Sequence, residues 1–110
     1  MQFLLILSED PDRIHSEDAV RRTGEYAMEL MGKGKLVGGA PLRPQAEARR
    51  IRKDGDAPRV IDGPFAETKE VIAGYMILEA ASLDEATELA QRCPNAEFGT
   101  VEVREIVPMG

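Results

Sequence analysis

Two stretches of the chain are apolar on both of their alternating faces, and this pattern constrains the fold more than any other feature. The stretches are residues 2–8 and 71–80. In the first, the apolar residues divide into Phe3, Leu5 and Leu7 on one face and Leu4 and Ile6 on the other. A strand that is apolar on both faces is covered on both sides. We therefore expect both stretches to be central strands of one sheet.

Two further stretches have helical periodicity. The first, residues 17–33, follows a plausible N-cap at Ser16 and ends at a pair of glycines. The second begins at the capping box that Ser82 and Glu85 form and ends before Pro94. The residues expected to face the core are Ala19, Thr23, Ala27, Leu30 and Met31 in the first helix and Leu83, Ala86, Thr87 and Ala90 in the second.

The remaining segments complete a recognisable order. Residues 35–40 and 99–107 have the pattern of strands, and residues 49–61 have that of a β-hairpin with Asp54-Gly55 as its turn. The order predicts an α+β fold of the ferredoxin-like βαβ–βαβ type with an inserted hairpin. Two helices cover one face of the antiparallel sheet, so we expect the other, apolar face to pack against a second copy in a homodimer.

Length and charge limit the functional classes. The chain has 110 residues, which fits one domain spanning residues 1–110, and its net charge is −6. A negative field disfavours direct nucleic-acid binding, and no apolar run is long enough to span a membrane. We therefore expect a cytoplasmic protein. The single cysteine, Cys93, is expected to be a buried, unreactive thiol.

The segment at residues 62–70, DGPFAETKE, concentrates charged side chains between two predicted strands. Its charged residues are Asp62, Glu67, Lys69 and Glu70, and Phe65 is expected to insert into the core and hold the loop in place. Two interpretations are open. The segment is either a polar turn, in which Asp62 caps and Lys69 pairs with a carboxylate, or the wall of a functional site.

This run, together with GKLVGGAPL at residues 34–42, SLDEA at residues 82–86, RCP at residues 92–94 and VEVR at residues 101–104, resembles the DGPF family of YCII-related proteins. The resemblance covers essentially the whole chain. It implies a dimeric α+β barrel, the fold of small monooxygenases and muconolactone isomerase. It implies no established reaction. Some members are encoded beside extracytoplasmic-function sigma factors, so the resemblance also implies a possible sigma-factor association.

The chain departs from the founding YCII branch at one important point. That branch has a His on the first helix and an Asp after the second strand, which together form a proposed catalytic pair. An alignment on residues 34–41 places Thr23 or a neighbour at the His position, and residues 42–48 contain no Asp. The acid–base role of that pair therefore does not transfer to this chain.

Four further residues are candidates for a site. His15, the only histidine, has an ordinary pKa of about 6.5 and is a candidate proton shuttle, or else a surface loop residue. Arg50 and Arg52 share a strand face and either hold an anion or pair with Asp62 or Glu67. Tyr75 is a candidate pocket residue or a core edge. No metal-ligand spacing and no cofactor motif are visible.

Two functional hypotheses follow. In the first, the protein binds a small polar or anionic metabolite near the DGPF segment, with acid–base enzymatic activity as an option. Asp62, Glu67 and His15 are then the catalytic candidates, and the binding candidates are Phe65, Lys69, Glu70, Arg50, Arg52 and Tyr75. In the second, the chain is a non-catalytic regulatory or interaction module whose partner is a sigma factor.

Overall fold

The computed structural model describes residues 1–10, 17–63 and 70–109, and all structural statements below concern these residues. Its main body is a four-stranded antiparallel sheet in the order β2-β5-β1-β6. The strands are β1 (Gln2–Glu9), β2 (Leu36–Pro41), β5 (Val71–Glu79) and β6 (Gly99–Glu105). The central strands are β1 and β5, which confirms the interpretation of the two stretches that are apolar on both faces.

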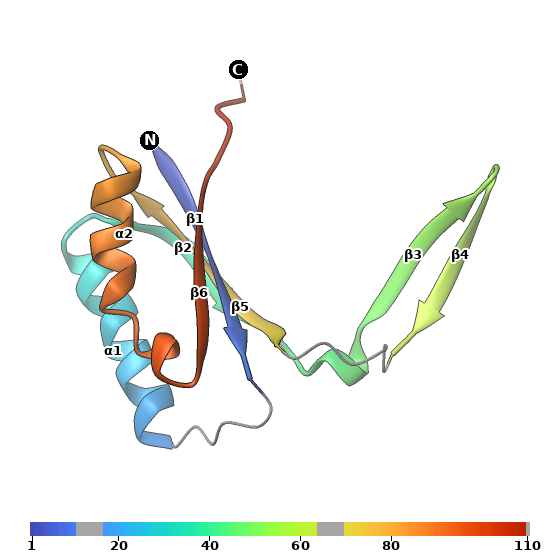
Figure 1. Cartoon of the computed structure of the whole chain (residues 1–110), viewed down its shortest axis with the longest axis horizontal. Helices are drawn as coiled ribbons and strands as arrows, with labels where there is room; N and C mark the ends of the chain where they lie inside the picture. Colours follow the sequence, from blue (N-terminus) through green and yellow to red (C-terminus); the bar gives the residue numbers. More distant parts are fainter. Residues whose placement is uncertain (11–16, 64–69, 110) are drawn as a thin grey trace.

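Two helices cover one face of this sheet, as the sequence predicts (Figure 1). They are α1 (Glu17–Gly32) and α2 (Leu83–Gln91), and a 3-10 helix, η2 (Pro94–Glu97), follows the second. The Ser82 hydroxyl accepts a hydrogen bond from the Glu85 amide at 3.1 Å, so the predicted N-cap of α2 is present. The α+β fold of the sequence prediction is thereby confirmed.

The core lies between the helices and the sheet. Phe3, Leu5, Leu78 and Cys93 are its largest fully buried side chains. The helices contribute Ala19, Tyr26 and Leu30 from α1 and Ala86, Leu89 and Ala90 from α2. The inward positions predicted for Met31, Leu83 and Thr87 were wrong, since all three are exposed. The three residues lie at the edge of the apolar face of their helices, where helical spacing alone does not determine burial. The larger side chains of Tyr26 and Leu89 fill the core at these helices instead.

The opposite face of the sheet is not covered by any helix. Alternation places Leu4 and Ile6 of β1 and Ile77 of β5 on this open face. The register shift between Leu7 and Ser8 brings Ile72 opposite Ser8, on the same face. Ile72 is 57% exposed. Because these residues are apolar and partly accessible, the open face has the composition of a surface that another layer covers.

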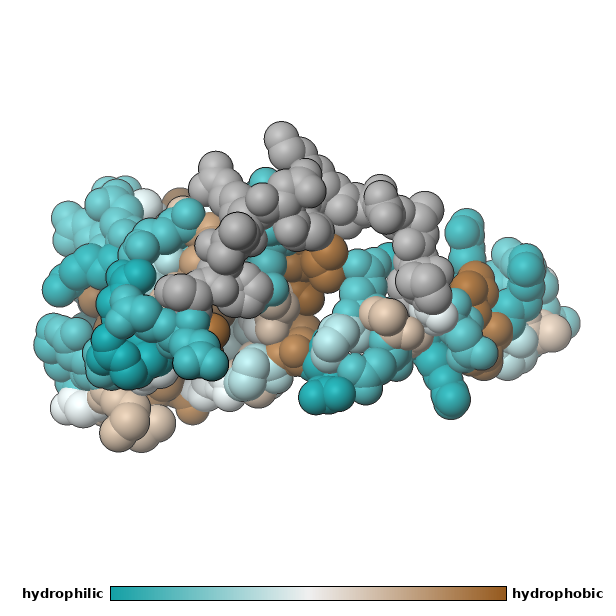
Figure 2. Space-filling view, turned by 90° about the horizontal axis from the view of Figure 1, so that it is seen from below, coloured by the Kyte–Doolittle hydropathy of each residue, from teal (hydrophilic) through white to brown (hydrophobic). Residues whose placement is uncertain are grey.

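The inserted hairpin forms a separate two-stranded sheet, β3 (Arg49–Asp54) paired with β4 (Ala57–Asp62). Its two-residue turn is Gly55-Asp56, one position later than the predicted Asp-Gly pair, with Gly55 at φ +75°. Figure 1 shows the hairpin on the side of the sheet away from the helices. The space-filling view in Figure 2 shows an open gap between the body and the hairpin. A short 3-10 helix, η1 (Gln45–Glu47), leads from β2 to the hairpin.

Candidate functional site

A cavity of about 370 Å³ lies between α1 and the part of the sheet that α2 does not cover. Its walls come from α1, β1, β2, β5 and the segment around η2. The described lining residues are Leu7, Glu9, Val20, Thr23, Gly24, Ala27, Leu36, Gly39, Ala40, Pro41, Ala73, Gly74, Tyr75, Met76, Asn95 and Phe98. A volume of this size is at the lower end of the range for small-molecule sites, and a single-ring compound would fit within it.

The cavity exists because the residues that face it are small. On α1, the positions at helical spacing that border it are Val20, Thr23, Gly24 and Ala27. A Cβ atom added at Gly24 would meet nothing within 4 Å. Larger side chains at these positions would pack against the sheet and close the space. The small side chains therefore leave a gap between α1 and the edge of the sheet.

Two glycines in the sheet keep the floor of the cavity intact. Gly39 on β2 has φ +156°, and a Cβ atom there would lie 2.5 Å from the Tyr75 carbonyl oxygen. At Gly74 on β5, a Cβ atom would lie 3.0 Å from the Ala40 carbonyl oxygen. Any side chain at Gly39 would push β2 away from β5. These glycines permit the close pairing of the two strands that line the cavity.

The polar lining residues are Glu9, Thr23, Tyr75 and Asn95, and the side-chain oxygens of Glu9 and Thr23 can accept hydrogen bonds from a ligand. Glu9, at the end of β1, supplies a carboxylate. The Thr23 hydroxyl donates to the Ala19 carbonyl at 2.9 Å, which leaves its oxygen able to accept. Asn95 is buried, and its Nδ2 donates to the carbonyls of Ser8 (2.9 Å) and Thr100 (3.2 Å). Asn95 therefore holds β1 and β6 together at the wall.

The buried titratable groups nearest in the core do not line the cavity. The Tyr26 hydroxyl donates to the Leu89 carbonyl at 2.7 Å, and burial raises the pKa of Tyr26. Burial also raises the pKa of the Cys93 thiol, which is 2% exposed. Neither group ionises near neutral pH in such surroundings. The prediction that Cys93 is buried is confirmed.

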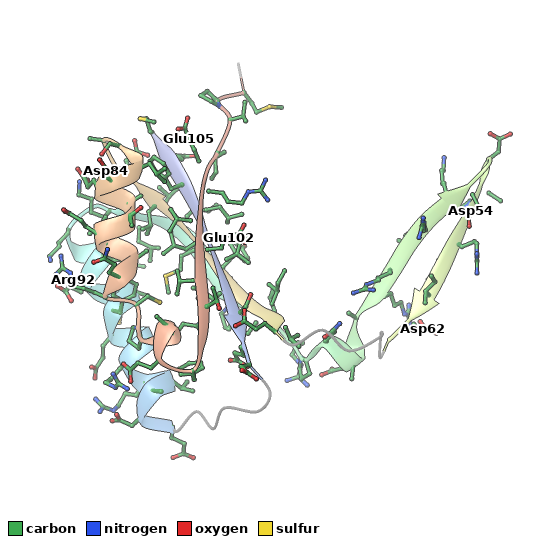
Figure 3. All side chains as sticks on the ribbon, viewed as in Figure 1. Asp54, Asp62, Asp84, Arg92, Glu102 and Glu105 are labelled. Atoms are coloured by element: carbon green, nitrogen blue, oxygen red, sulfur yellow. The ribbon has the colours of Figure 1, made fainter. Side chains whose placement is uncertain are left out.

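The residues that the sequence singled out on the hairpin lie away from this cavity. Asp62 ends β4, and its carboxylate pairs with the Arg49 guanidinium at 3.1 Å across the hairpin. The Asp62 side chain is 77% exposed, and Figure 3 shows it at the base of the hairpin, on the far side of the sheet from α1. Arg50 and Arg52 share the opposite hairpin face and are exposed. None of these residues is among the described lining residues.

The other sequence candidates have varied positions. Glu70 precedes β5 and accepts a hydrogen bond from the Thr100 hydroxyl at 2.6 Å, so it joins the segment before β5 to β6. Tyr75 borders the cavity, but its register opposite Ile6 assigns its side chain to the open face. His15, Phe65, Glu67 and Lys69 lie outside the described residues, and their proposed roles stay predictions.

Most of the residues that line the cavity were not candidates from the sequence, because they are small or apolar. Glu9 and Gly24 are not among the residues that the sequence pattern indicates as site candidates. The available signal was the run of small residues at Thr23, Gly24 and Ala27 on the inward side of a helix, which leaves room against a sheet. Thr23 is also the position aligned with, or next to, the histidine of the founding YCII branch, and it lies in the cavity wall.

Two searches of the described residues gave no further site. No group of three or more His, Cys, Asp or Glu side chains lies close enough together to hold a metal ion in residues 1–10, 17–63 and 70–109. Within the same ranges, no helix has both the length and the apolar character needed to cross a membrane. The cavity is therefore the candidate site with the best-defined geometry.

Comparisons with known proteins agree with this architecture. An uncharacterised protein of Rhizobium meliloti (strain 1021) is 43% identical over 75 residues, a match that covers 66% of this chain and 60% of that protein's length. The solved 5-chloro-2-hydroxyhydroquinone dehydrochlorinase of Burkholderia phenoliruptrix AC1100, in complex with 2,5-dihydroxybenzoquinone, matches with a TM-score of 0.50 at 20% identity, over 97% of this chain and 94% of the other. The model of the YCII-related domain matches residues 1–110. The chain therefore belongs to the family of proteins with a YCII-related domain.

Proposed function

We propose that this protein binds a small, single-ring hydroxylated compound, such as a phenol or a hydroquinone, in the cavity between α1 and the sheet. The observation that carries the proposal is the cavity itself: about 370 Å³, mostly apolar walls, and the acceptor groups of Glu9 and Thr23. Apolar walls with a few placed polar groups are the usual composition of a small-molecule site. A ligand hydroxyl would donate to the Glu9 carboxylate.

The composition of the wall narrows the ligand class that the sequence indicated. The sequence favoured a polar or anionic metabolite, yet the described lining residues contain no Lys or Arg, and Glu9 is negatively charged. An anion would lose hydration in this cavity and be repelled by Glu9. The dehydrochlorinase of similar fold was solved with a one-ring hydroxyquinone. That compound ionises as a vinylogous acid, so neutral hydroquinone and catechol are the first probes for this chain.

If the protein is an enzyme, proton transfer is the reaction class that the cavity supports. A carboxylate beside a bound phenolic hydroxyl can accept its proton as a general base. Glu9 is the group in position for this role. The sequence-based alternative assigns it to Asp62 or Glu67 of the DGPF segment. Glu9→Gln and Asp62→Asn therefore separate the two sites.

The binding experiment uses two substitutions at one position. Gly24→Leu places a large side chain in the cavity, whereas Gly24→Ala adds only a methyl group, and both improve helix propensity. Isothermal titration with hydroquinone and catechol is expected to give a Kd at least about tenfold higher for Gly24→Leu than for the wild type. Gly24→Ala should change the Kd much less.

Two outcomes contradict the proposal. If the ring compounds bind equally well to Gly24→Leu, their site is not this cavity. If they do not bind, while a small anion such as benzoate stabilises the protein in a manner abolished by Asp62→Asn or Arg52→Ala, the site lies at the hairpin. Glu9→Gln should weaken binding of hydroxylated rings while leaving the unfolding temperature without ligand nearly unchanged.

We also propose that the chain forms a homodimer through the open face of the sheet. Leu4, Ile6, Ile72 and Ile77 give this face its apolar composition. Light scattering at micromolar concentration should give the mass of two chains. Ile72→Lys, which changes a side chain already 57% exposed, should shift the mass toward one chain without unfolding it. A wild-type monomer under these conditions would rule out this dimer.

A further inference from the structure

The β3–β4 hairpin exposes every residue of both its strands. It stands on the side of the sheet that carries the open face, separated from the body by a gap (Figures 1 and 2). The radius of gyration is 15.8 Å, compared with about 13 Å for a compact chain of this length. The molecule is therefore extended by a ribbon that makes little contact with its own body.

The register of the hairpin gives it two different faces. One face has the cross-strand pair Ile51–Val60 with Pro58 beside it, and the other has Arg50, Arg52 and Arg59 together with Ile61. Ile51 is 72% exposed and Val60 is 62% exposed. A two-stranded ribbon alone is marginally stable in water. An apolar pair at its centre indicates that the ribbon packs against another surface.

The base of the hairpin is fixed, which makes it a defined arm. The Gly63 amide donates to the Ala48 carbonyl at 2.9 Å, and the Arg49–Asp62 ion pair closes the same end at 3.1 Å. The Arg59–Asp54 pair, also 3.1 Å, lies near the turn. These contacts order the ribbon along its length. They do not cover the Ile51–Val60 pair.

Charge identifies the kind of partner. The hairpin, residues 49–62, has five basic and three acidic side chains, a net charge of +2, which leaves −8 on the rest of the chain. A basic arm is complementary to an acidic body, and the body of a second copy has this character. On the open face itself, Glu102 pairs with Arg104 at 3.8 Å, so the charge complementarity rests on the net charge of the body as a whole (Figure 3).

The length of the arm fits the same partner. A strand of six residues spans about 20 Å, and the four strands of a sheet, with three spacings between them, span about 14 Å. The β3 strand has six residues. A second copy that packs its sheet on the open face would enter the space in front of the hairpin. The arm is then long enough to cross the side of that copy.

We propose that the β3–β4 hairpin is an intermolecular arm that packs its Ile51–Val60 face against the body of a second copy of this chain. Each copy in the dimer holds the other with its own arm, in addition to contact between the sheets. The proposal is independent of the ligand assigned to the cavity. It assigns the inserted hairpin a role in assembly.

The test is the double variant Ile51→Thr/Val60→Thr, measured by sedimentation equilibrium. Threonine keeps the β-branched shape, so the ribbon retains its strand propensity while losing its apolar face. The dimer dissociation constant is expected to rise at least about tenfold. Met28→Gln is the matched control, because Met28 is also 72% exposed but lies on α1, and it should leave the constant unchanged.

A photo-crosslinking residue at position 51 identifies what the arm contacts. In a mixture of isotopically labelled and unlabelled chains, cross-links between the two kinds of chain are expected. Cross-links confined to one chain, or a dissociation constant unaffected by the double variant, would overturn the proposal. So would binding of duplex DNA or of a sigma factor that depends on the arm while the dimer does not.

Discussion

The body and the hairpin of this molecule differ in how far their strands are buried. In the body, Phe3, Leu5 and Leu78 have no exposure, and the buried face of each strand has a helix against it. In the hairpin, every residue of β3 and β4 is exposed, so neither face of the ribbon has a covering layer among the described residues. Backbone hydrogen bonds and strand register are therefore enough to define the shape of a two-stranded ribbon. Its stability in water depends on packing against another surface.

The largest expected contrast comes from truncating one apolar side chain in each region. Leu5→Ala should lower the free energy of unfolding by about 2–5 kcal/mol, since it opens a cavity in the core. Ile51→Ala should change it by less than about 0.5 kcal/mol in a monomer, because the side chain is exposed. Urea unfolding in an Ile72→Lys background, where the chain is expected to be monomeric, measures both. Equal effects would erase the contrast.

A smaller contrast comes from two glycines with nearly the same backbone. Gly34, after α1, has φ +71°, and Gly55, in the hairpin turn, has φ +75°. A Cβ atom would meet nothing within 4 Å at either position, so only the backbone cost differs from the wild type. Gly34→Ala should destabilise the body by about 1 kcal/mol. Gly55→Ala should leave thermal unfolding of the body unchanged and weaken the dimer. A loss of body stability in Gly55→Ala would show that the hairpin folds together with the body.

The smallest expected effect is a dependence of body stability on acid pH. Arg22 hydrogen-bonds both Glu97 and Asp18, Lys33 bonds Glu29, and Lys35 bonds Glu85 at 2.9 Å. These contacts hold the pKa of each of the four carboxyls below its ordinary value; for Asp18 the larger contribution comes from Arg21. A lowered folded-state pKa contributes stability above the unfolded-state pKa and loses it as the pH falls through the folded-state value.

Stability of the body should therefore decline as the pH falls below about 4.5, the region where free Asp and Glu titrate. Urea titrations at pH 7 and pH 3.5 measure the decline. Arg22→Gln removes the partner that ties α1 to the segment at Glu97, so its stability should depend less on pH in this range. An unchanged pH dependence in that variant would mean that other groups control the acid response.

Features determined by local sequence were the ones that could be predicted. The Ser82 cap, the two central strands and the inserted hairpin each follow from a few neighbouring residues, and the structure has them all. The position of the hairpin relative to the sheet could not be predicted, because nothing in the sequence of residues 49–62 indicates which surface the hairpin packs against. The burial of Tyr26 and Leu89 could not be predicted either, because it depends on how each helix is rotated and how closely it packs against the sheet.

The candidate site was harder to predict than the fold for a physical reason. The visible signal in the sequence is the cluster of charged side chains at residues 62–70, which indicates Asp62 and its neighbours. The cavity instead arises where α1, β2 and β5 all present small residues, and those elements meet only in the folded chain. Gly24 and Gly39 are fifteen positions apart, and neither has a side chain that signals chemistry.

The small residues that α1 presents to the cavity have a consequence for how its shape can change. Because Gly24 has open space beyond it, residues there can grow or shrink without disturbing the sheet, while Gly39 and Gly74 must stay as they are. The position that would set the shape of the cavity, Gly24, is therefore different from the positions that the sheet needs as glycine, Gly39 and Gly74. On the proposed function, substitutions on one helix face would change the preferred ligand by small steps while the scaffold beneath stays constant.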